Sequence, residues 1–169
     1  LARALPLIHA RLMAQQVQEV RYFLLGYGEQ QAELMQLIQQ PEYQGIPIQV
    51  SFEANPVNIL KYAKIFYSLQ QNTNYPSKSL LEAMACGNLP LVTDVGSTRL
   101  IAPPDCSFYV DEDFTAEQLA TQTVAALTLP APDMAAKMAS ARQFVTERFA
   151  MRDMAAYYYA IYDQLAGSA

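Results

Sequence analysis

Cysteine and histidine are scarce in this sequence, and tryptophan is absent. The 169 residues include two cysteines and one histidine. Cys86 lies in an apolar helical pattern and Cys106 in a loop, and no C-x-x-C pair occurs, so neither a disulfide framework nor a zinc site is predicted. His9 has no Ser, Cys or Asp in a recognisable partner arrangement. No catalytic triad and no metal site is therefore indicated.

Positive charge is low as well. Eleven Lys and Arg stand against sixteen Asp and Glu, for a net charge of -5. Phosphate backbones attract clustered Lys and Arg, so nucleic acid and anionic membrane are not expected as partners. The sequence has no run of about 18 apolar residues, and its start, LARALPLIHARL, has no small-residue cleavage site. With few cysteines, this pattern favours a soluble protein in a reduced, cytoplasmic setting.

The sequence does contain an alternation of short apolar runs with helical patterns. At 169 residues and 52% hydrophobic composition, it is long enough for one domain with a sizeable core. Strand-like runs alternate with helical ones, which predicts an α/β fold with a mostly parallel, doubly wound sheet. The expected strands are 20–28, 46–52, 64–69, 89–94 and 106–111. Residues 133–169 are expected to form terminal helices.

The start of the chain is unusual for such a domain. Residues 2–18 have helical apolar spacing, but no capping residue and no strand precedes them. We therefore expect residues 1–169 to be a single domain that begins in mid-fold, as a fragment would.

Ligands of parallel α/β sheets bind beyond the carboxyl ends of the strands, where helix N-termini offer N–H groups to anions. The loop 70–79 and the turn 94–98 follow predicted strands and occupy such positions. The segment GYG at 26–28 is a third candidate, but Gln31 stands where the G-x-G-x-x-G fingerprint needs its third glycine. A plain tight turn is the favoured interpretation of that segment.

Glu82 is a lone carboxylate inside the apolar helical pattern LLEAMACG. In one interpretation, Ser79 and Glu82 form an S-x-x-E capping box, in which the carboxylate accepts from the Ser79 N–H. If Ser77 caps the helix instead, Glu82 lies beyond the first turn and its carboxylate is available to the hydroxyls of a ligand. The pattern alone leaves both interpretations open.

Residues 63–102 are similar to a known family. Here A-K-I-F-Y-S-L is followed by N-Y-P-S-K-S-L-L-E-A-M-A-C-G-N-L-P-L-V-T-D-V-G. This resembles the segment E-G-F-G-L-x-L-L-E-A-M-A-C-G-x-P-V-V-A-T-D-V-G of the retaining, nucleotide-sugar-dependent glycosyltransferases of family four (group 1), specifically of their C-terminal domain. The likeness extends over V-R-Y-F-L-L-G-Y-G and the closing helices. It implies a Rossmann-like doubly wound parallel sheet with helices on both faces and a helical C-terminal tail.

The resemblance also implies roles for single residues. The family Glu that holds the ribose hydroxyls falls on Glu82, where a carboxylate can accept two charge-assisted hydrogen bonds. The family Glu that contacts the transferred sugar falls on Asn74. We expect Asn74 to contact the donor sugar in the catalytic site, although an amide carries no charge to a developing oxocarbenium ion. The other expected contacts are Tyr75, Ser77, Lys78 and Ser79 for the diphosphate and sugar, and, more loosely, Phe52 and Glu53 for the nucleobase.

The function implied by the resemblance is that of a donor-binding C-terminal domain. The expected reaction transfers a sugar from a nucleotide diphosphate sugar, a UDP-sugar by preference, to a glycan or lipid-linked acceptor with retention, without metal or cofactor, in polysaccharide biosynthesis. A strand and the acceptor-binding N-terminal domain would precede Leu1, so the isolated fragment is expected to be inactive. The exposed inter-domain face leaves homo-oligomer formation open, and membrane association of the full-length cytoplasmic enzyme also stays open.

Two alternatives of other classes remain. The first is a non-catalytic nucleotide- or glycan-binding module, because Asn74 replaces the family Glu, and Pro76 and Ser77 replace glycines beside it. The second is an α/β scaffold domain that uses its tyrosine-rich last helix for assembly. Loss of nucleotide binding in solution would favour the second alternative over the first.

Overall fold

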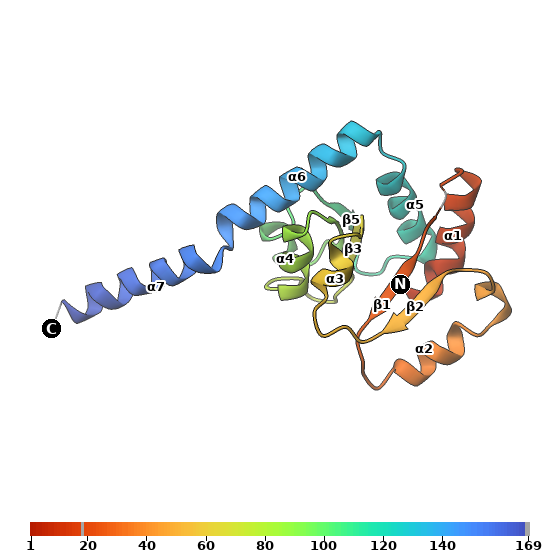
Figure 1. Ribbon diagram of the computed structural model, residues 1–169, viewed down its shortest axis with the longest axis horizontal. Coiled ribbons are helices and arrows are strands. Elements are labelled where there is room, and N and C mark those ends of the chain that lie inside the picture. The colour runs from red at the N-terminus through yellow and green to blue at the C-terminus, as the bar shows by residue number, and fades with distance from the viewer. Residues whose placement is uncertain (18, 168–169) are drawn as a thin grey trace.

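The computed structural model describes residues 1–17 and 19–167 and shows a mixed α/β architecture (Figure 1). Each predicted strand is present, although shorter than its apolar run. The strands are β1 (Tyr22–Leu25), β2 (Ile48–Ser51), β3 (Ile65–Ser68), β4 (Leu89–Thr93) and β5 (Phe108–Val110). The helices are α1 (Leu5–Ala14), α2 (Gln31–Leu37), α3 (Val57–Leu60), α4 (Lys78–Ala85), α5 (Ala116–Leu127), α6 (Ala131–Arg148) and α7 (Met151–Ala166).

All strand pairs in the described part of the chain are parallel, but they form two sheets instead of the single expected one. One sheet pairs β1 with β2, with Leu24 opposite Val50. The other has the order β3-β4-β5, with Tyr67 opposite Leu91. The strands are therefore parallel and alternate with helices as predicted, and within the described residues they are divided into two groups because β1 and β3 do not pair.

The three-stranded sheet is the buried centre of the molecule. Every residue of β4 is buried, as a nearly continuous apolar run predicts for a central parallel strand. On one side of the sheet, α4 and α6 pack around Leu80, Met84 and Val92, each 0% exposed. At about 25 cal/mol per Å² of buried apolar surface, such side chains each contribute roughly 2 kcal/mol.

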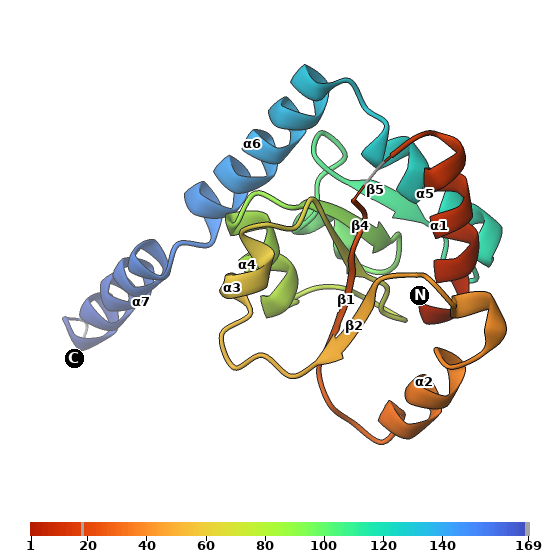
Figure 2. The same ribbon diagram turned by 45° about the vertical axis from the view of Figure 1, so that its right-hand side comes forward.

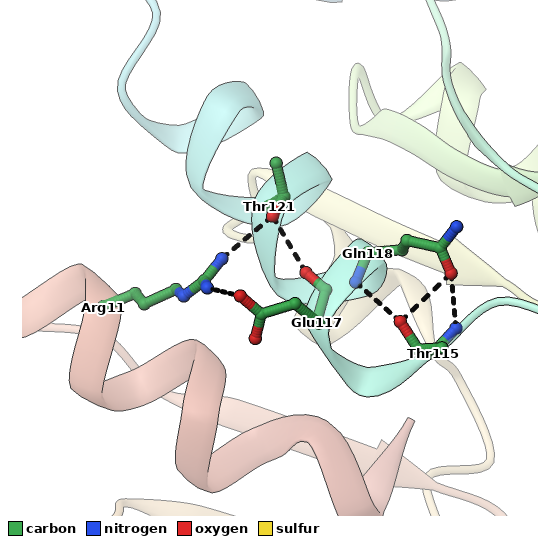
Figure 3. Close-up of polar contacts among 5 residues, drawn as sticks. All are labelled: Arg11, Thr115, Glu117, Gln118 and Thr121. Atoms are coloured by element: carbon green, nitrogen blue, oxygen red, sulfur yellow. Dashed lines mark hydrogen bonds and ion pairs between the residues drawn. The ribbon is translucent and has the colours of Figure 1, made fainter.

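The other side of the core is formed by α1 and α5, which lie next to each other in both views (Figures 1 and 2). Leu5, Ile8 and Leu12 of α1 recur at helical spacing and are 0–1% exposed. Arg11 joins the two helices at the surface. Its guanidinium donates to the Thr121 hydroxyl of α5 over 2.9 Å and forms an ion pair with the Glu117 carboxylate, also of α5 (Figure 3).

The start of α5 is fixed by its own side chains. Thr115 accepts from the backbone N–H of Gln118, and the Gln118 side chain accepts from the Thr115 N–H over 2.7 Å, which is a reciprocal capping box (Figure 3). The first helix is shorter than its pattern, because α1 ends at Ala14. The terminal helices begin at Ala131, two residues before the expected position.

Helix α7 extends away from the body of the domain in both views (Figures 1 and 2). None of its described residues is buried. Its exposed aromatic side chains include Tyr157, Tyr159 and Tyr162, between 64% and 70% exposed. These tyrosines therefore do not pack onto the domain within the described residues.

Candidate functional site

Two segments meet at the carboxyl edge of β3 and β4, which is the edge that the sequence singled out. The first is the loop that joins β3 to α4, and the second is the turn that begins at Asp94. Gly96 in the turn has φ of +51°, and a Cβ there would lie 2.5 Å from the Asn72 carbonyl oxygen and 2.8 Å from the Thr73 Cβ. Only glycine therefore allows the turn to approach the loop this closely.

Asn74 lies at the centre of this contact and is 1% exposed. Its amide oxygen accepts from the Ser68 hydroxyl over 2.7 Å. Its amide nitrogen donates to the Thr93 carbonyl over 3.0 Å, to the Thr93 hydroxyl over 3.1 Å and to the Thr98 hydroxyl over 3.0 Å. The side chain thus connects the end of β3, the end of β4 and the turn after β4.

The two threonine hydroxyls explain why an amide suits this position. The Thr93 hydroxyl donates to the Gln70 carbonyl and the Thr98 hydroxyl donates to the Val95 carbonyl, each over 2.6 Å. Each hydroxyl has one proton, so toward Asn74 both act as acceptors, and so does the Thr93 carbonyl. A carboxylate would meet three acceptors there.

This geometry corrects the expected role of Asn74. A side chain that is 1% exposed, with both amide atoms bonded to the protein, does not reach a sugar on the surface in this conformation. We assign Asn74 a positioning role, because it fixes the loop and the turn that frame the carboxyl edge. The sequence placed the residue at the right edge but gave no signal that its side chain turns inward.

The N-terminus of α4 resolves the two interpretations of Glu82. Ser77, not Ser79, is the N-cap, and its hydroxyl accepts from the Leu80 N–H. Glu82 lies beyond the first turn and has no capping bond. Its carboxylate is directed back along the helix to the Lys78 ammonium, 3.6 Å away, and its side chain is 36% exposed. Side chains of helices point toward the N-terminus, so Glu82 extends toward the same edge as Ser79.

The remaining predicted residues of this loop lie close by. Tyr75 is 42% exposed, its N–H donates to the Thr73 hydroxyl, and its bond to Pro76 is cis. The first N–H groups of a helix lack intrahelical acceptors, and Ser77 satisfies only that of Leu80. The N–H groups of Lys78 and Ser79 are therefore available at the edge, as expected for an anion site.

Asp94 and Arg99 form an ion pair at the same edge. The guanidinium donates to both carboxylate oxygens, over 2.9 Å and 2.5 Å. These hydrogen bonds lower the pKa of the Asp94 carboxyl below its ordinary value. Arg99 also lies over the Tyr109 ring, 4.8 Å from its centroid, so its guanidinium is held on two sides.

The expected nucleobase residues follow β2, and the structure adds an aromatic partner that sequence reasoning missed. Phe52 is 65% exposed, and its ring contacts that of Tyr27, 80% exposed, edge to face with centroids 5.3 Å apart. Glu53 accepts from the Asn55 N–H, which makes a local turn. Tyr27 belongs to the GYG segment that was interpreted as a turn. The structure gives the reason for the contact: Leu25 pairs with Ser51 in parallel, which brings the ends of both strands together.

A large cavity lies elsewhere, between β1 and β3. Its volume is about 1390 Å³, and residues from both strands line it, together with Tyr27. Glu82 and the α4 N-terminus are not part of its lining. Tyr67 lies at this cavity, and burial raises the pKa of its hydroxyl to about 12, although a hydrogen bond with Thr123 opposes the shift.

Within the described ranges, no group of three or more His, Cys, Asp or Glu side chains could hold a metal ion. In the same ranges, none of the helices has both the length and the apolar character that a membrane span requires.

The family follows from the sequence as a whole. Residues 3–143 match the family described as glycosyl transferases group 1. The chain belongs to this family. Its members are glycosyltransferases, so the resemblance that rested on the LLEAMACG segment is confirmed. Among curated proteins, no sequence matches this chain significantly.

Solved structures agree on the fold. A sucrose-phosphate synthase from Thermosynechococcus elongatus is 19% identical, with a TM-score of 0.77 over 98% of this chain and 43% of its own. A glycosyltransferase from Rickettsia africae is 17% identical, with a TM-score of 0.74 over 97% of this chain and 45% of its own. HepE from Anabaena, solved in complex with UDP-glucose, is 19% identical, with a TM-score of 0.74 over 98% of this chain and 44% of its own.

These similarities confirm the expected α/β, Rossmann-like fold with a helical C-terminal tail. The chain spans less than half the length of the solved relatives that it matches.

Proposed function

We propose that this chain is the donor-binding C-terminal part of a glycosyltransferase that uses a nucleotide diphosphate sugar. The observation that carries the proposal is the family match over residues 3–143, in combination with an acid, Glu82, that has no capping role and extends toward the carboxyl edge of the sheet. A UDP-sugar is the donor of choice, because the HepE structure that resembles this chain was solved with UDP-glucose.

The proposed donor lies across the carboxyl edge. The diphosphate faces the N–H groups of Lys78 and Ser79 and the Lys78 ammonium, where the positive end of the helix dipole favours anions. The ribose hydroxyls donate to Glu82. Releasing Lys78 from Glu82 costs little, since exposed i,i+4 pairs contribute only about 0.3–0.5 kcal/mol. Tyr75 and the Ser77 hydroxyl border the diphosphate and sugar.

The nucleobase lies against the exposed rings of Phe52 and Tyr27 in this proposal. Stacking on an aromatic side chain is worth about 1–3 kcal/mol per base, and the two rings are 65% and 80% exposed. Glu53 follows Phe52 and borders the same region. Tyr27→Ala should therefore weaken UDP binding roughly tenfold, which isothermal titration calorimetry would measure, with the equally exposed Tyr62→Ala as the control.

The proposed reaction is transfer with retention to a glycan or lipid-linked acceptor in polysaccharide biosynthesis, in the cytoplasm. The developing charge on the leaving diphosphate is stabilised by fixed N–H dipoles and Lys78, without a metal or cofactor. The acceptor site and further catalytic groups belong to an N-terminal domain of the same enzyme. The isolated chain should then bind donor and not turn it over.

The burial of Asn74 favours one second candidate, a nucleotide-binding module without catalysis. The family carboxylate that contacts the sugar falls on this position, and the amide here is directed into the interior. Donor binding through Glu82 does not depend on that missing carboxylate. Turnover of UDP-sugars by the full-length protein would decide for the transferase, whereas UDP binding without turnover would decide for the module.

The first test is thermal-shift titration of the chain with UDP, GDP and ADP. The proposal expects UDP to raise the melting temperature in a concentration-dependent way, because a ligand that binds only the folded state stabilises it. No stabilisation by any of the three nucleotides in the full-length protein would contradict the proposal. A rise in melting temperature with GDP or ADP but not with UDP would show that the donor carries a base other than uracil.

A further inference from the structure

A pocket separate from the donor site lies between helix α6 and the segment that begins with the short helix η3 (Thr98–Leu100). Its volume is about 300 Å³. The residues that line it are Arg99, Leu100, Pro103 and Asp105 on one side and Ser140, Phe144 and Arg148 on the other. We call this space the arginine pocket. Lys78, Ser79 and Glu82 are absent from its lining, so it is distinct from the edge at which the donor is placed.

The α6 side of the pocket is built by helical spacing. Ser140, Phe144 and Arg148 follow one another at i, i+4 and i+8 and therefore lie along one face of the helix. Side chains of a helix point toward its N-terminus, so the Arg148 guanidinium reaches back over the Phe144 ring, 5.1 Å from its centroid. This cation–π contact holds the guanidinium at the pocket.

The charge of Arg148 is not neutralised by the protein. The ion pairs formed by the described residues include none to Arg148. A guanidinium is a planar fork of N–H donors that matches the oxygens of a phosphate. Arg148 can therefore supply both charge and directed hydrogen bonds to an oxyanion in the pocket.

Arg99 supplies the second guanidinium, from the opposite side of the pocket. Its Nε donates to one oxygen of Asp94 and its Nη2 to the other, and the guanidinium also lies over the Tyr109 ring. These two bonds use only part of the donors of an arginine, so both N–H groups of Nη1 and one of Nη2 remain for a ligand. The pair with Asp94 thus orients Arg99 without exhausting it.

The charges around the pocket favour an anion in spite of Asp105. Lys137 lies one turn before Ser140 on α6, and its ammonium donates to the Asp105 carbonyl over 2.8 Å. A cation therefore stands beside the one carboxylate of the lining. Asp94 is matched by Arg99 in the same way, which leaves the charge of Arg148 in excess. Such a local excess of positive charge stands out in a chain whose net charge is -5.

We propose that the arginine pocket binds a phosphate monoester. Its oxygens accept from Arg99 on one side and Arg148 on the other, and bidentate bonds of this kind are among the strongest that proteins form to phosphate. The Ser140 hydroxyl donates one more. The bound ester bridges η3 and α6.

The size of the pocket and the charge of the chain define the ester further. A volume of about 300 Å³ is at the lower end of the roughly 300–1,000 Å³ of ligand pockets, so a phosphate with a short organic group fits. Leu100 and Pro103 give that group an apolar border. The ester is free in solution and not a lipid headgroup, because the net charge of -5 opposes approach to an anionic bilayer.

The test titrates the full chain with glycerol 3-phosphate at constant ionic strength and without nucleotide. Isothermal titration calorimetry gives the affinity, and NMR of the arginine Nε–H groups shows where the ester binds. We expect saturable binding with shifts at Arg99 and Arg148. Glycerol has the same organic group without the charge and should shift neither arginine.

Two substitutions on α6 give a matched comparison. Arg148→Gln keeps a side chain that can cover Phe144 and removes the charge, so it should weaken binding about tenfold or more. Arg142→Gln removes an exposed arginine of the same helix that is not in the lining, and it should change the affinity by less than about twofold, because distant exposed charges are screened. Circular dichroism checks that both variants are folded.

A third substitution separates the arginine pocket from the proposed diphosphate position, which a phosphate ester can also reach. Lys78→Gln should leave the Arg148 shift and its half-saturation unchanged. None of these measurements uses a nucleotide, so their failure and the failure of the proposed function are distinguishable.

Three results would overturn the proposal. The first is an ester that leaves Arg99 and Arg148 unshifted, or shifts them without saturation. The second is equal affinity of Arg148→Gln and wild type. The third comes from vesicles of phosphatidylcholine and phosphatidic acid, whose headgroup is also a phosphate monoester: sedimentation of the chain with these vesicles, without binding of free glycerol 3-phosphate, would show a lipid ligand instead.

Discussion

The burial of Asn74 makes a prediction that separates its amide from a carboxylate of the same shape. Asn74→Asp replaces the amide nitrogen with an oxygen and changes almost no volume. That oxygen faces the Thr93 carbonyl and the hydroxyls of Thr93 and Thr98, which all act as acceptors in the native structure. Asn74→Ala removes the bonds without adding a charge.

The magnitudes follow from the bonds. Asn74→Ala loses one accepted bond and the two that its N–H groups can donate at a time, at about 1 kcal/mol each, so the free energy of unfolding should fall by about 3 kcal/mol. For Asn74→Asp, an unpaired charge in a site that is 1% exposed should lower the free energy of unfolding by about 3–5 kcal/mol at pH 7.

The two variants should differ in their pH dependence. Burial without donors raises the pKa of the new Asp in the folded state, so the folded protein binds a proton more tightly than the unfolded chain. The penalty is absent below the unfolded pKa of about 3.9 and grows as the pH rises toward the folded pKa. A penalty of about 3 kcal/mol places the folded pKa roughly 2 pH units higher.

Urea unfolding at pH 7 and pH 5, followed by circular dichroism, measures both effects. The difference in the free energy of unfolding between Asn74→Asp and wild type should be smaller at pH 5 than at pH 7. The corresponding difference for Asn74→Ala should be the same at both pH values. The exposed Asn58→Ala is the control and should remain within about 0.5 kcal/mol of wild type. An Asn74→Asp variant as stable as wild type at pH 7 would refute the account of the three acceptors.

Further predictions concern the turn after β4. Gly96→Ala should lower the free energy of unfolding by about 2–4 kcal/mol, because φ of +51° is unfavourable for alanine and its Cβ would meet the Asn72 carbonyl. Urea unfolding measures this change, and a free energy of unfolding equal to that of wild type would contradict the prediction. Arg99→Ala should raise the pKa of Asp94, because the guanidinium that lowers it is removed. The ionised Asp94 stabilises the fold above its unfolded pKa, and this effect is lost as the pH falls through its folded pKa. NMR titration of the carboxyl carbon would measure the pKa, and an unchanged pKa of Asp94 in the variant would contradict the ion pair.

The elements of the fold could be predicted from local pattern because each carries its own signal. The apolar run 89–94 indicated a strand of a parallel sheet, and β4 is such a strand with every residue buried. The division into two sheets could not be predicted in this way. Strand pairing depends on neighbours that are distant in sequence, and the facing edges of β1 and β3 have no local signature.

The candidate site was predictable to a similar extent. The spacing in LLEAMACG located Glu82, and the structure decided between the two caps because the Ser77 hydroxyl, not that of Ser79, accepts from Leu80. The inward orientation of Asn74 depends on Ser68, Thr93 and Thr98 together. Only the folded arrangement brings those three side chains to one point, so sequence pattern could not reveal it.

The contact between Glu82 and the ribose of a nucleotide is the central claim, and isothermal titration of UDP tests it most directly. Glu82→Gln should weaken UDP binding by about tenfold or more, because hydrogen bonds to a charged acceptor are worth about 1.5–3 kcal/mol each. Glu147→Gln is the matched control, since Glu147 is an exposed helical carboxylate that also accepts from a residue one turn earlier. Equal UDP affinity of Glu82→Gln and wild type would contradict the account.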